Sequence, residues 1–171
     1  MLFSLRAFKK RLPFHQKRLR QFLSKIEAKN PKNLDSVVEK LDKETWKDID
    51  CLACANCCKM MTPTYTPKDL KRISKHLKMS VNEFKKKWLY KDKSGDWMNT
   101  STPCQFLKKD NKCSIYEVRP VDCSGFPHIA KKKVIDYIHI QKQNLAFCPA
   151  TFKVVEKMEK YWEEKKFSGQ K

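Results

Sequence analysis

The chain has 171 residues, a length typical of one domain with room for a hydrophobic core. It carries 38 lysine and arginine residues against 19 acidic residues, and only six of the 38 are arginine. This balance permits an acidic partner, but the shortage of arginine argues against specific readout of bases or phosphates. No apolar run approaches the roughly 20 residues of a membrane-spanning helix, so no membrane span is expected.

The first residues do not meet the criteria for an export signal. Arg6 interrupts the initial apolar run before it reaches the roughly 7–15 residues of a signal-peptide core, and no small-residue cleavage site follows. Residues 1–26 lack any acid, a loose similarity to a mitochondrial transit peptide. We expect a cytoplasmic protein, in which clustered cysteines are more often metal ligands than disulfides.

Two helices are expected before the first cysteine, over residues 2–29 and from about 35 to 48. In the first, apolar residues at three-, four- and seven-residue steps form one stripe, which Pro13 should kink or divide. We expect the stripe to pack on the domain or on a partner. The basic opposite face leaves open membrane association and weak, non-specific binding of nucleic acid or protein. The stripe consists of Leu5, Phe8, Leu12, Leu19, Phe22 and Ile26.

Two scaffold helices should follow the first cysteine cluster. Thr66, with Pro67 at the first helical position and Asp69 three residues on, forms a capping box. Ser80 and Glu83 repeat the signal for a second short helix. The faces expected to be buried carry Leu70, Ile73, Leu77, Phe84 and Trp88.

The later part of the chain is less regular. Residues 91–127 are rich in turn formers, including Asp110-Asn111, and predict loops with short extended pieces held by something other than a large core. Residues 131–147 fit a strand or a helix. A final helix should begin at Pro149. The expected fold is mostly α: a small single domain with an irregular, loop-rich metal-binding region and an N-terminal amphipathic helical extension.

The eight cysteines carry the strongest chemical signal in the sequence. Residues 51–58 read C-x2-C-x2-C-C, and two residues between thiols let both sulfurs converge on one ion. The adjacent Cys57 and Cys58 should diverge, so one of them could bind or bridge a second ion or stay outside the site. Eight thiolates could fill two four-cysteine sites, or one site with four left over. The candidate metal ligands are Cys51, Cys54, Cys57, Cys58, Cys104, Cys113, Cys123 and Cys148.

Other residues near the cysteines suggest supporting roles. His128 and Asp122 could replace a cysteine, although a surface histidine and a loop hydrogen-bonding aspartate are the simpler interpretations. Arg119 could bind loop carbonyls or, with Lys59 and Lys112, offset thiolate charge. The residues expected to pack around the site and exclude water are Ile115, Tyr116 and Phe126.

Three stretches carry a family resemblance: CLACANCC at 51–58, PCQFLKKDNKCSIYEVRPVDCSGFP at 103–127, and Cys148-Pro149. They resemble the YkgJ-type cysteine-cluster family, also called CxxCxxCC or zinc- or iron-chelating domain proteins. The resemblance covers roughly 48–155 and implies a metal- or cluster-binding domain there. The expected division is therefore an N-terminal helical extension at 1–47, a cysteine-cluster domain at 48–155, and the remainder of the C-terminal helix and tail at 156–171.

Three functions remain open from the sequence. The first is a cysteine-rich protein that binds zinc or iron, or an iron–sulfur cluster, in a structural or sensory role. The second is a cluster-dependent redox or group-transfer enzyme, since larger relatives similar around the cysteines include flagellin lysine methylases. Its catalytic residues are unknown, because no G-x-G-x-x-G loop, P-loop or nucleophile–base pair is evident. The third is a basic, zinc-stapled nucleic-acid-binding protein, although zinc-finger spacing is absent.

Overall fold

The computed structural model describes residues 4–168, and the chain is mostly α-helical with a loop-rich cysteine region, as predicted. It forms two compact units. The helical unit consists of the residues up to Asp50 together with those from Pro127 onward, and the cysteine unit is Cys51–Phe126. Seven of the eight cysteines belong to the cysteine unit. The predicted division at 1–47, 48–155 and 156–171 follows motif content rather than compactness, and it stays a prediction.

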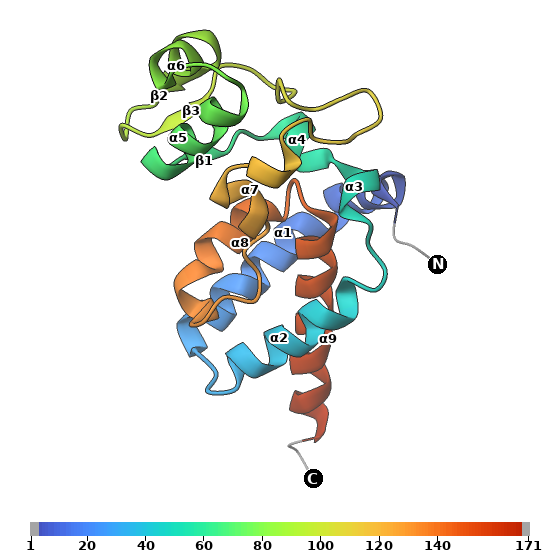
Figure 1. Ribbon diagram of the computed structural model, residues 1–171. Helices are drawn as coiled ribbons and strands as arrows, with labels where there is room; N and C mark the ends of the chain where they lie inside the picture. Colours follow the sequence, from blue (N-terminus) through green and yellow to red (C-terminus); the bar gives the residue numbers. More distant parts are fainter. Residues whose placement is uncertain (1–3, 169–171) are drawn as a thin grey trace. The chain divides into compact units, whose positions relative to one another are not determined.

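The helical unit is built around its last helix, α9, which packs against α1, α2 and α8 (Figure 1). The stretch 131–147, which fitted a strand or a helix, is helical, and the carboxylate of Asp35 accepts hydrogen bonds from the backbone N–H groups of Lys133 and Val134 at its start. The elements of this unit are α1 (Leu5–Lys29), α2 (Leu34–Thr45), the 3₁₀ helix η2 (Val134–Tyr137), α8 (Ile138–Asn144) and α9 (Pro149–Ser168).

The apolar stripe of α1 packs within the unit, as expected. Phe8 meets Phe152 of α9 edge to face, with 5.5 Å between ring centroids. Pro13 does not divide α1, which runs on through it. A proline inside a helix costs about 3 kcal/mol, and we attribute the continuity of the helix to the packing of the stripe on both sides of it. The buried residues of α1 are Phe8, Leu19, Leu23 and Ile26.

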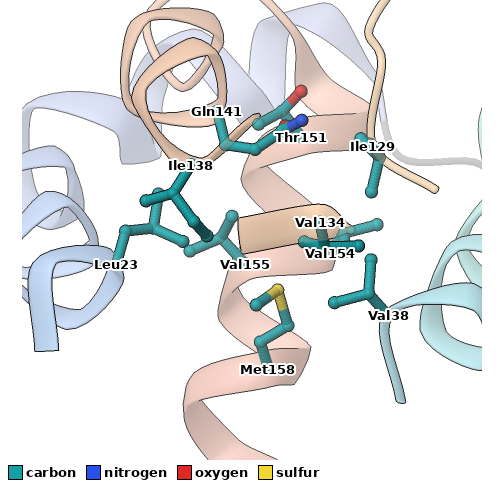
Figure 2. A pocket seen from close by; sticks show the side chains of 10 residues that line it. All are labelled: Leu23, Val38, Ile129, Val134, Ile138, Gln141, Thr151, Val154, Val155 and Met158. Atoms are coloured by element: carbon teal, nitrogen blue, oxygen red, sulfur yellow. The ribbon is translucent and has the colours of Figure 1, made fainter. Parts of the chain in front are cut away.

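A small pocket lies in the core of the helical unit (Figure 2). Eight of its ten lining residues are apolar, and the other two are Gln141 and Thr151. Gln141 Oε1 and Thr151 Oγ1 are buried and have no hydrogen-bond partner within the described part of the chain. The lining holds no thiol, carboxylate or imidazole, so this pocket is not a candidate metal site.

The cysteine unit combines short helices with a three-stranded antiparallel sheet of order β1-β3-β2. Both predicted capping boxes are present, with Thr66 and Asp69 at the start of α5 and Ser80 and Glu83 at the start of α6. The elements are α3 (Cys51–Cys54), α4 (Asn56–Met60), β1 (Thr64–Tyr65), α5 (Pro67–His76), α6 (Val81–Trp88), β2 (Leu89–Lys91), β3 (Trp97–Asn99), η1 (Tyr116–Val118) and α7 (Val121–Gly125).

One expectation about this unit is wrong in part. Residues 91–127 are irregular, but they contribute Phe106 and Ile115 to a hydrophobic core shared with α5 and α6. Phe106 stacks on Phe84 with 6.3 Å between ring centroids. The large apolar side chains that flank the cysteines are therefore packing residues, and the loops do not depend on the cysteines alone.

Across residues 4–168, no helix combines the length and the apolar character that a membrane span requires.

Candidate metal centre

The first four cysteines lie on two consecutive one-turn helices, α3 and α4. Ala55, between them, has a left-handed backbone with φ of 45°, a conformation that costs a non-glycine residue about 1–2 kcal/mol. The expected divergence of the adjacent thiols is wrong, because Cys57 and Cys58 Sγ lie 3.9 Å apart. The helix α3 also meets the later loop, since Asn111 Nδ2 donates a 3.3 Å hydrogen bond to the Ala53 carbonyl.

The backbone brings the two cysteine-containing stretches of this unit together. The N–H of Cys104 donates a 2.8 Å hydrogen bond to the carbonyl of Cys58. Cys113 returns to the same region through the predicted turn, where Leu107 and Cys113 form an isolated antiparallel bridge. The turn is closed by a 2.8 Å hydrogen bond from the Lys108 N–H to the Lys112 carbonyl. Three cysteines far apart in sequence thus become neighbours.

The electrostatics place Cys123 in the same group. Burial raises the pKa of the Cys104, Cys113 and Cys123 thiols, and negative charge at Cys58 raises each of them further. Cys104 and Cys113 also raise the pKa of Cys123. Each of these four side chains therefore interacts electrostatically with the others. We call Cys58, Cys104, Cys113 and Cys123 the thiol cluster.

Cys58 differs from the other members of the thiol cluster. A hydrogen bond from the Cys57 thiol, helped by the charge of Lys59, outweighs burial and lowers the pKa of Cys58 to about 7. One member is therefore readily deprotonated, and its charge disfavours a second thiolate unless a cation joins the group. Among residues 4–168, no three His, Cys, Asp or Glu side chains converge as closely as the ligands of a bound ion do. Within the described residues, the thiol cluster is thus a set of electrostatically coupled thiols and not a closed set of metal ligands.

A buried carboxylate positions the segment that carries Cys123. Asp69 has no exposed side-chain surface, and burial acts to raise its pKa. Hydrogen bonds from Thr66, Arg72 and the Val121 N–H outweigh burial and hold the pKa of Asp69 below its usual value. Arg72 also donates to the Arg119 carbonyl at 2.8 Å. The N-terminal turn of α5 therefore fixes the start of α7, two residues before Cys123.

Two residues beside the cluster have the roles expected of them. Asp122 is a structural hydrogen-bonder, although it lies in the first turn of α7 and not in a loop: its Oδ2 accepts a 3.1 Å hydrogen bond from the Thr64 N–H of β1. Arg119 donates a 2.7 Å hydrogen bond to the Tyr116 carbonyl, and its positive charge lowers the pKa of Cys113. Asp122 has the opposite effect, since its charge raises the pKa of Cys123.

The expected apolar lining is confirmed only in part. Ile115 is buried in the core against which Cys104 and Cys113 pack, and Phe126 is half-buried. Tyr116 is 41% exposed, so the prediction that it shields the site is wrong. Its ring instead supports the Arg119 guanidinium, which lies 3.7 Å from the ring centroid.

The sequence does not predict the buried polar group formed by Tyr65, Asn99 and Gln105. The hydroxyl of Tyr65 donates a 2.6 Å hydrogen bond to Asn99 Oδ1, and Gln105 Nε2 donates to the same oxygen at 3.0 Å. Burial raises the pKa of Tyr65, and so does negative charge at Cys104, Cys123 and Cys113. The hydroxyl therefore interacts electrostatically with three members of the thiol cluster. No spacing rule links these residues to the cysteines.

The other predicted metal ligands lie outside the thiol cluster. Cys51 is exposed, and Cys54 and Cys57 are half-buried in the cysteine unit. Cys148 is buried in the helical unit, where its N–H donates to the Asn144 carbonyl at 2.8 Å. His128, also in the helical unit, has a left-handed backbone, and its carbonyl accepts a 2.6 Å hydrogen bond from Gln141.

Comparison with known proteins gives this arrangement a context. A family model named CxxCxxCC and described as "Putative zinc- or iron-chelating domain" matches residues 50–149, more than half of the chain. The chain belongs to the CxxCxxCC family. The CxxCxxCC match begins just before Cys51 and ends just after Cys148, so it spans all eight cysteines.

One protein that is similar to this chain is the uncharacterized protein MJ0661 of Methanocaldococcus jannaschii. It is 37% identical to the chain over 81 residues, which are 46% of this chain and 43% of that protein. The chain thus spans less than half the length of the curated relative that it matches. No solved structure matches the chain.

Proposed function

We propose that the protein is a metal-binding module in which the thiol cluster holds one zinc ion or one iron–sulfur cluster. The observation that carries the proposal is the gathering of Cys58, Cys104, Cys113 and Cys123, whose charges act on one another in a partly buried place. Four thiolates suit both zinc and iron–sulfur clusters. The other predicted ligands, Cys51, Cys54, Cys57 and Cys148, are proposed on their sequence spacing and the family alone.

The residues present fit such a group in charge as well as in ligand type. Four thiolates on one divalent ion carry a net charge of about −2 by formal counting. Positive charge at Arg119 and Lys108 lowers the pKa of Cys113, and Lys59 does the same for Cys58. These cations favour the thiolate form that a metal requires. When bound, zinc would supply a structural crosslink and an iron–sulfur cluster would supply electron transfer.

A structural or sensory role is the form of this proposal that the fold supports best. The four thiols come from α4, from both sides of the turn at 108–112, and from α7. A bound metal would tie these short elements to one another, and its loss would release them together. The hydrogen bonds of Asp69 and Arg72 hold the start of α7 against α5, and the bond from the Cys104 N–H to the Cys58 carbonyl joins two of the cysteine-bearing segments.

Nucleic-acid binding has weaker support. The FKKKWLY segment at 84–90 combines basic and aromatic residues, but Phe84 is fully buried and Trp88 packs against the same core. The rings of Phe84 and Trp88 are therefore not displayed for stacking on bases, and only Tyr90 of this segment has an exposed ring. The exposed basic residues of α1 remain as a surface for weak, non-specific contact with phosphates.

The decisive experiment is anaerobic purification followed by quantitation of metal and acid-labile sulfide per chain. Iron with sulfide and a brown colour would assign an iron–sulfur cluster. Zinc in colourless protein would assign a zinc site. A folded protein that contains neither metal, and that takes up neither zinc nor iron with sulfide on reconstitution, would contradict the proposal.

A further inference from the structure

We propose that the pocket in the core of the helical unit binds one internal water molecule, which bridges the side chains of Gln141 and Thr151. The inference does not rest on the proposed metal site, because every residue that lines the pocket belongs to the helical unit. Three observations support it: the orientation of the Gln141 amide, the burial of the Thr151 hydroxyl, and the size of the cavity that both side chains line.

The Gln141 amide is oriented by its contact with His128. Gln141 lies on α8 and is 3% exposed. Its Nε2 donates a 2.6 Å hydrogen bond to the His128 carbonyl. Because a carbonyl oxygen can only accept, the amide nitrogen must face it and cannot exchange places with the amide oxygen. The oxygen, Oε1, is buried without a partner among the described residues and therefore needs a donor.

The Thr151 hydroxyl is also buried without a partner within residues 4–168. A threonine inside a helix can donate to the carbonyl four residues earlier, as Thr45 does to Leu41 at 2.7 Å. For Thr151 the residue four positions earlier is Phe147, which precedes the start of α9 at Pro149. The position of Thr151 in the first turn of its helix therefore explains why its hydroxyl is available to another partner.

The cavity that both side chains line is otherwise apolar, as Figure 2 shows. About 10 Å³ of it is open to the centre of a water molecule. One water needs roughly 10–15 Å³ on this measure, so the cavity suits one water and no organic ligand. This water would donate one hydrogen to Gln141 Oε1 and form its second hydrogen bond with Thr151 Oγ1. Two polar partners meet the minimum that a buried water requires.

The bridge would extend to the segment where the chain enters the helical unit. Gln141 binds the His128 carbonyl, and Asn144 Nδ2 donates to the Pro127 carbonyl at 3.0 Å. His128 has a left-handed backbone with φ of 58°, a conformation that a non-glycine residue keeps only where its surroundings impose it. The water would connect Thr151 of α9, through Gln141, to this carbonyl. It would therefore help α9 to fix the backbone at 127–128.

The test is the detection of long-lived water by NMR in the full-length protein. The readout is the nuclear Overhauser effect from water to the methyl groups of Val155 and Met158, which line the cavity and carry no exchangeable side-chain proton. Wild type should show both signals. Thr151→Val keeps the approximate volume and removes the hydroxyl, so both signals should be lost. Thr45→Val is the matched control and should retain them, because the buried Thr45 hydroxyl already donates to Leu41.

Absence of both signals from the folded wild-type protein would overturn the inference, whatever the variants show. Signals of wild-type intensity in folded Thr151→Val would also overturn it, because the water would then not depend on this hydroxyl. If Thr151→Val does not fold, Gln141→Met takes its place, and undiminished signals there overturn the bridge. No cysteine lines the pocket, so the proposed metal site stands or falls separately from these results.

Discussion

The backbone N–H of Cys104 donates a 2.8 Å hydrogen bond to the carbonyl of Cys58. This bond, together with the one from Asn111 Nδ2 to the Ala53 carbonyl, joins the C-x2-C-x2-C-C motif to the later cysteine stretch. The pKa of Cys58 is lowered to about 7, whereas burial raises the pKa of the Cys104, Cys113 and Cys123 thiols. The backbone thus brings two of the cysteine-bearing stretches together. Under the proposed function, a bound cation would make four thiolates compatible with one another.

Metal affinity should rise with pH. The raised pKa values of Cys104, Cys113 and Cys123 mean that a metal must displace protons from these thiols when it binds. Acidification therefore favours release. Zinc titrations of the apoprotein in two buffers of different ionisation enthalpy should show proton release of more than one per ion near pH 7. Uptake without proton release would show that the cluster thiols do not ligate the metal.

The apoprotein should lose stability as the pH rises. A thiol whose pKa is higher in the folded than in the unfolded chain stabilises the fold below the unfolded value of about 8.5, and that contribution is lost as the solution becomes more alkaline. Denaturant unfolding of the apo form should shift to lower midpoints above about pH 8.5. The zinc-loaded form should not show this shift, because its thiolates are already compensated. Parallel pH profiles for the two forms would show that the cluster thiols do not cause the loss.

Asp69→Asn should destabilise the cysteine unit by about 2–3 kcal/mol, because the fully buried carboxylate accepts charge-assisted hydrogen bonds from Arg72, Thr66 and Val121. The lowered pKa of Asp69 also means that its contribution is present above the unfolded value of about 3.9 and is lost on acidification. Urea unfolding measures the effect. Asp96→Asn, at an exposed position, is the matched control. Equal free energies of unfolding for the two variants would show that Asp69 does not hold the start of α7 in place.

Metal removal should expose the short cysteine-bearing elements and spare the packed ones. We expect hydrogen exchange to accelerate in α3, α4, the turn at 108–112 and α7 after chelation. Protection should persist in α5 and α6, which share a core with Phe106 and Ile115. An unchanged exchange pattern after complete loss of metal would show that ligation contributes little to the folding of these elements.

Any nucleic-acid binding should be weak, independent of sequence and lost as salt rises. Arg6, Lys10 and Lys17 lie on the exposed side of α1 and meet phosphates as point charges. Changing all three to Glu should reduce retention on DNA or RNA more than the same change at three exposed positions of α5, namely Lys68, Lys71 and Lys75. Binding isotherms at low and near-physiological salt provide the comparison. Tight, sequence-selective binding that survives both changes would favour the nucleic-acid hypothesis.

The sequence predicts features that depend on neighbouring residues. Both capping boxes are correct because the side chain and the backbone N–H that it accepts from are three residues apart. Of the six residues in the predicted apolar stripe of α1, Phe8, Leu19 and Ile26 are buried and the other three are half-buried, because helical spacing is local; the prediction misses Leu23. The alternative that Pro13 divides the helix is wrong, because a local rule for proline cannot include packing against a distant helix.

The sequence does not predict polar contacts between segments that are far apart along the chain. The cap at Asp69 is readable, but its bond to the Val121 N–H joins segments that only the fold brings together. Asn99 carries no motif, and the hydrogen bonds that its buried side chain accepts from Tyr65 and Gln105 appear only in the fold. Tyr116 fails as a lining residue because its place in the C-x-I-Y stretch does not reveal which way its ring faces.

The central claim is that Cys58, Cys104, Cys113 and Cys123 hold the metal, and its most direct test is the metal bound per chain in four single Cys→Ser variants. Each variant, purified without oxygen beside wild type, should lose most of the metal or cluster of this site. Ser114→Ala, an exposed neighbour of Cys113, should retain the wild-type content. Wild-type metal content in all four folded variants would contradict the claim.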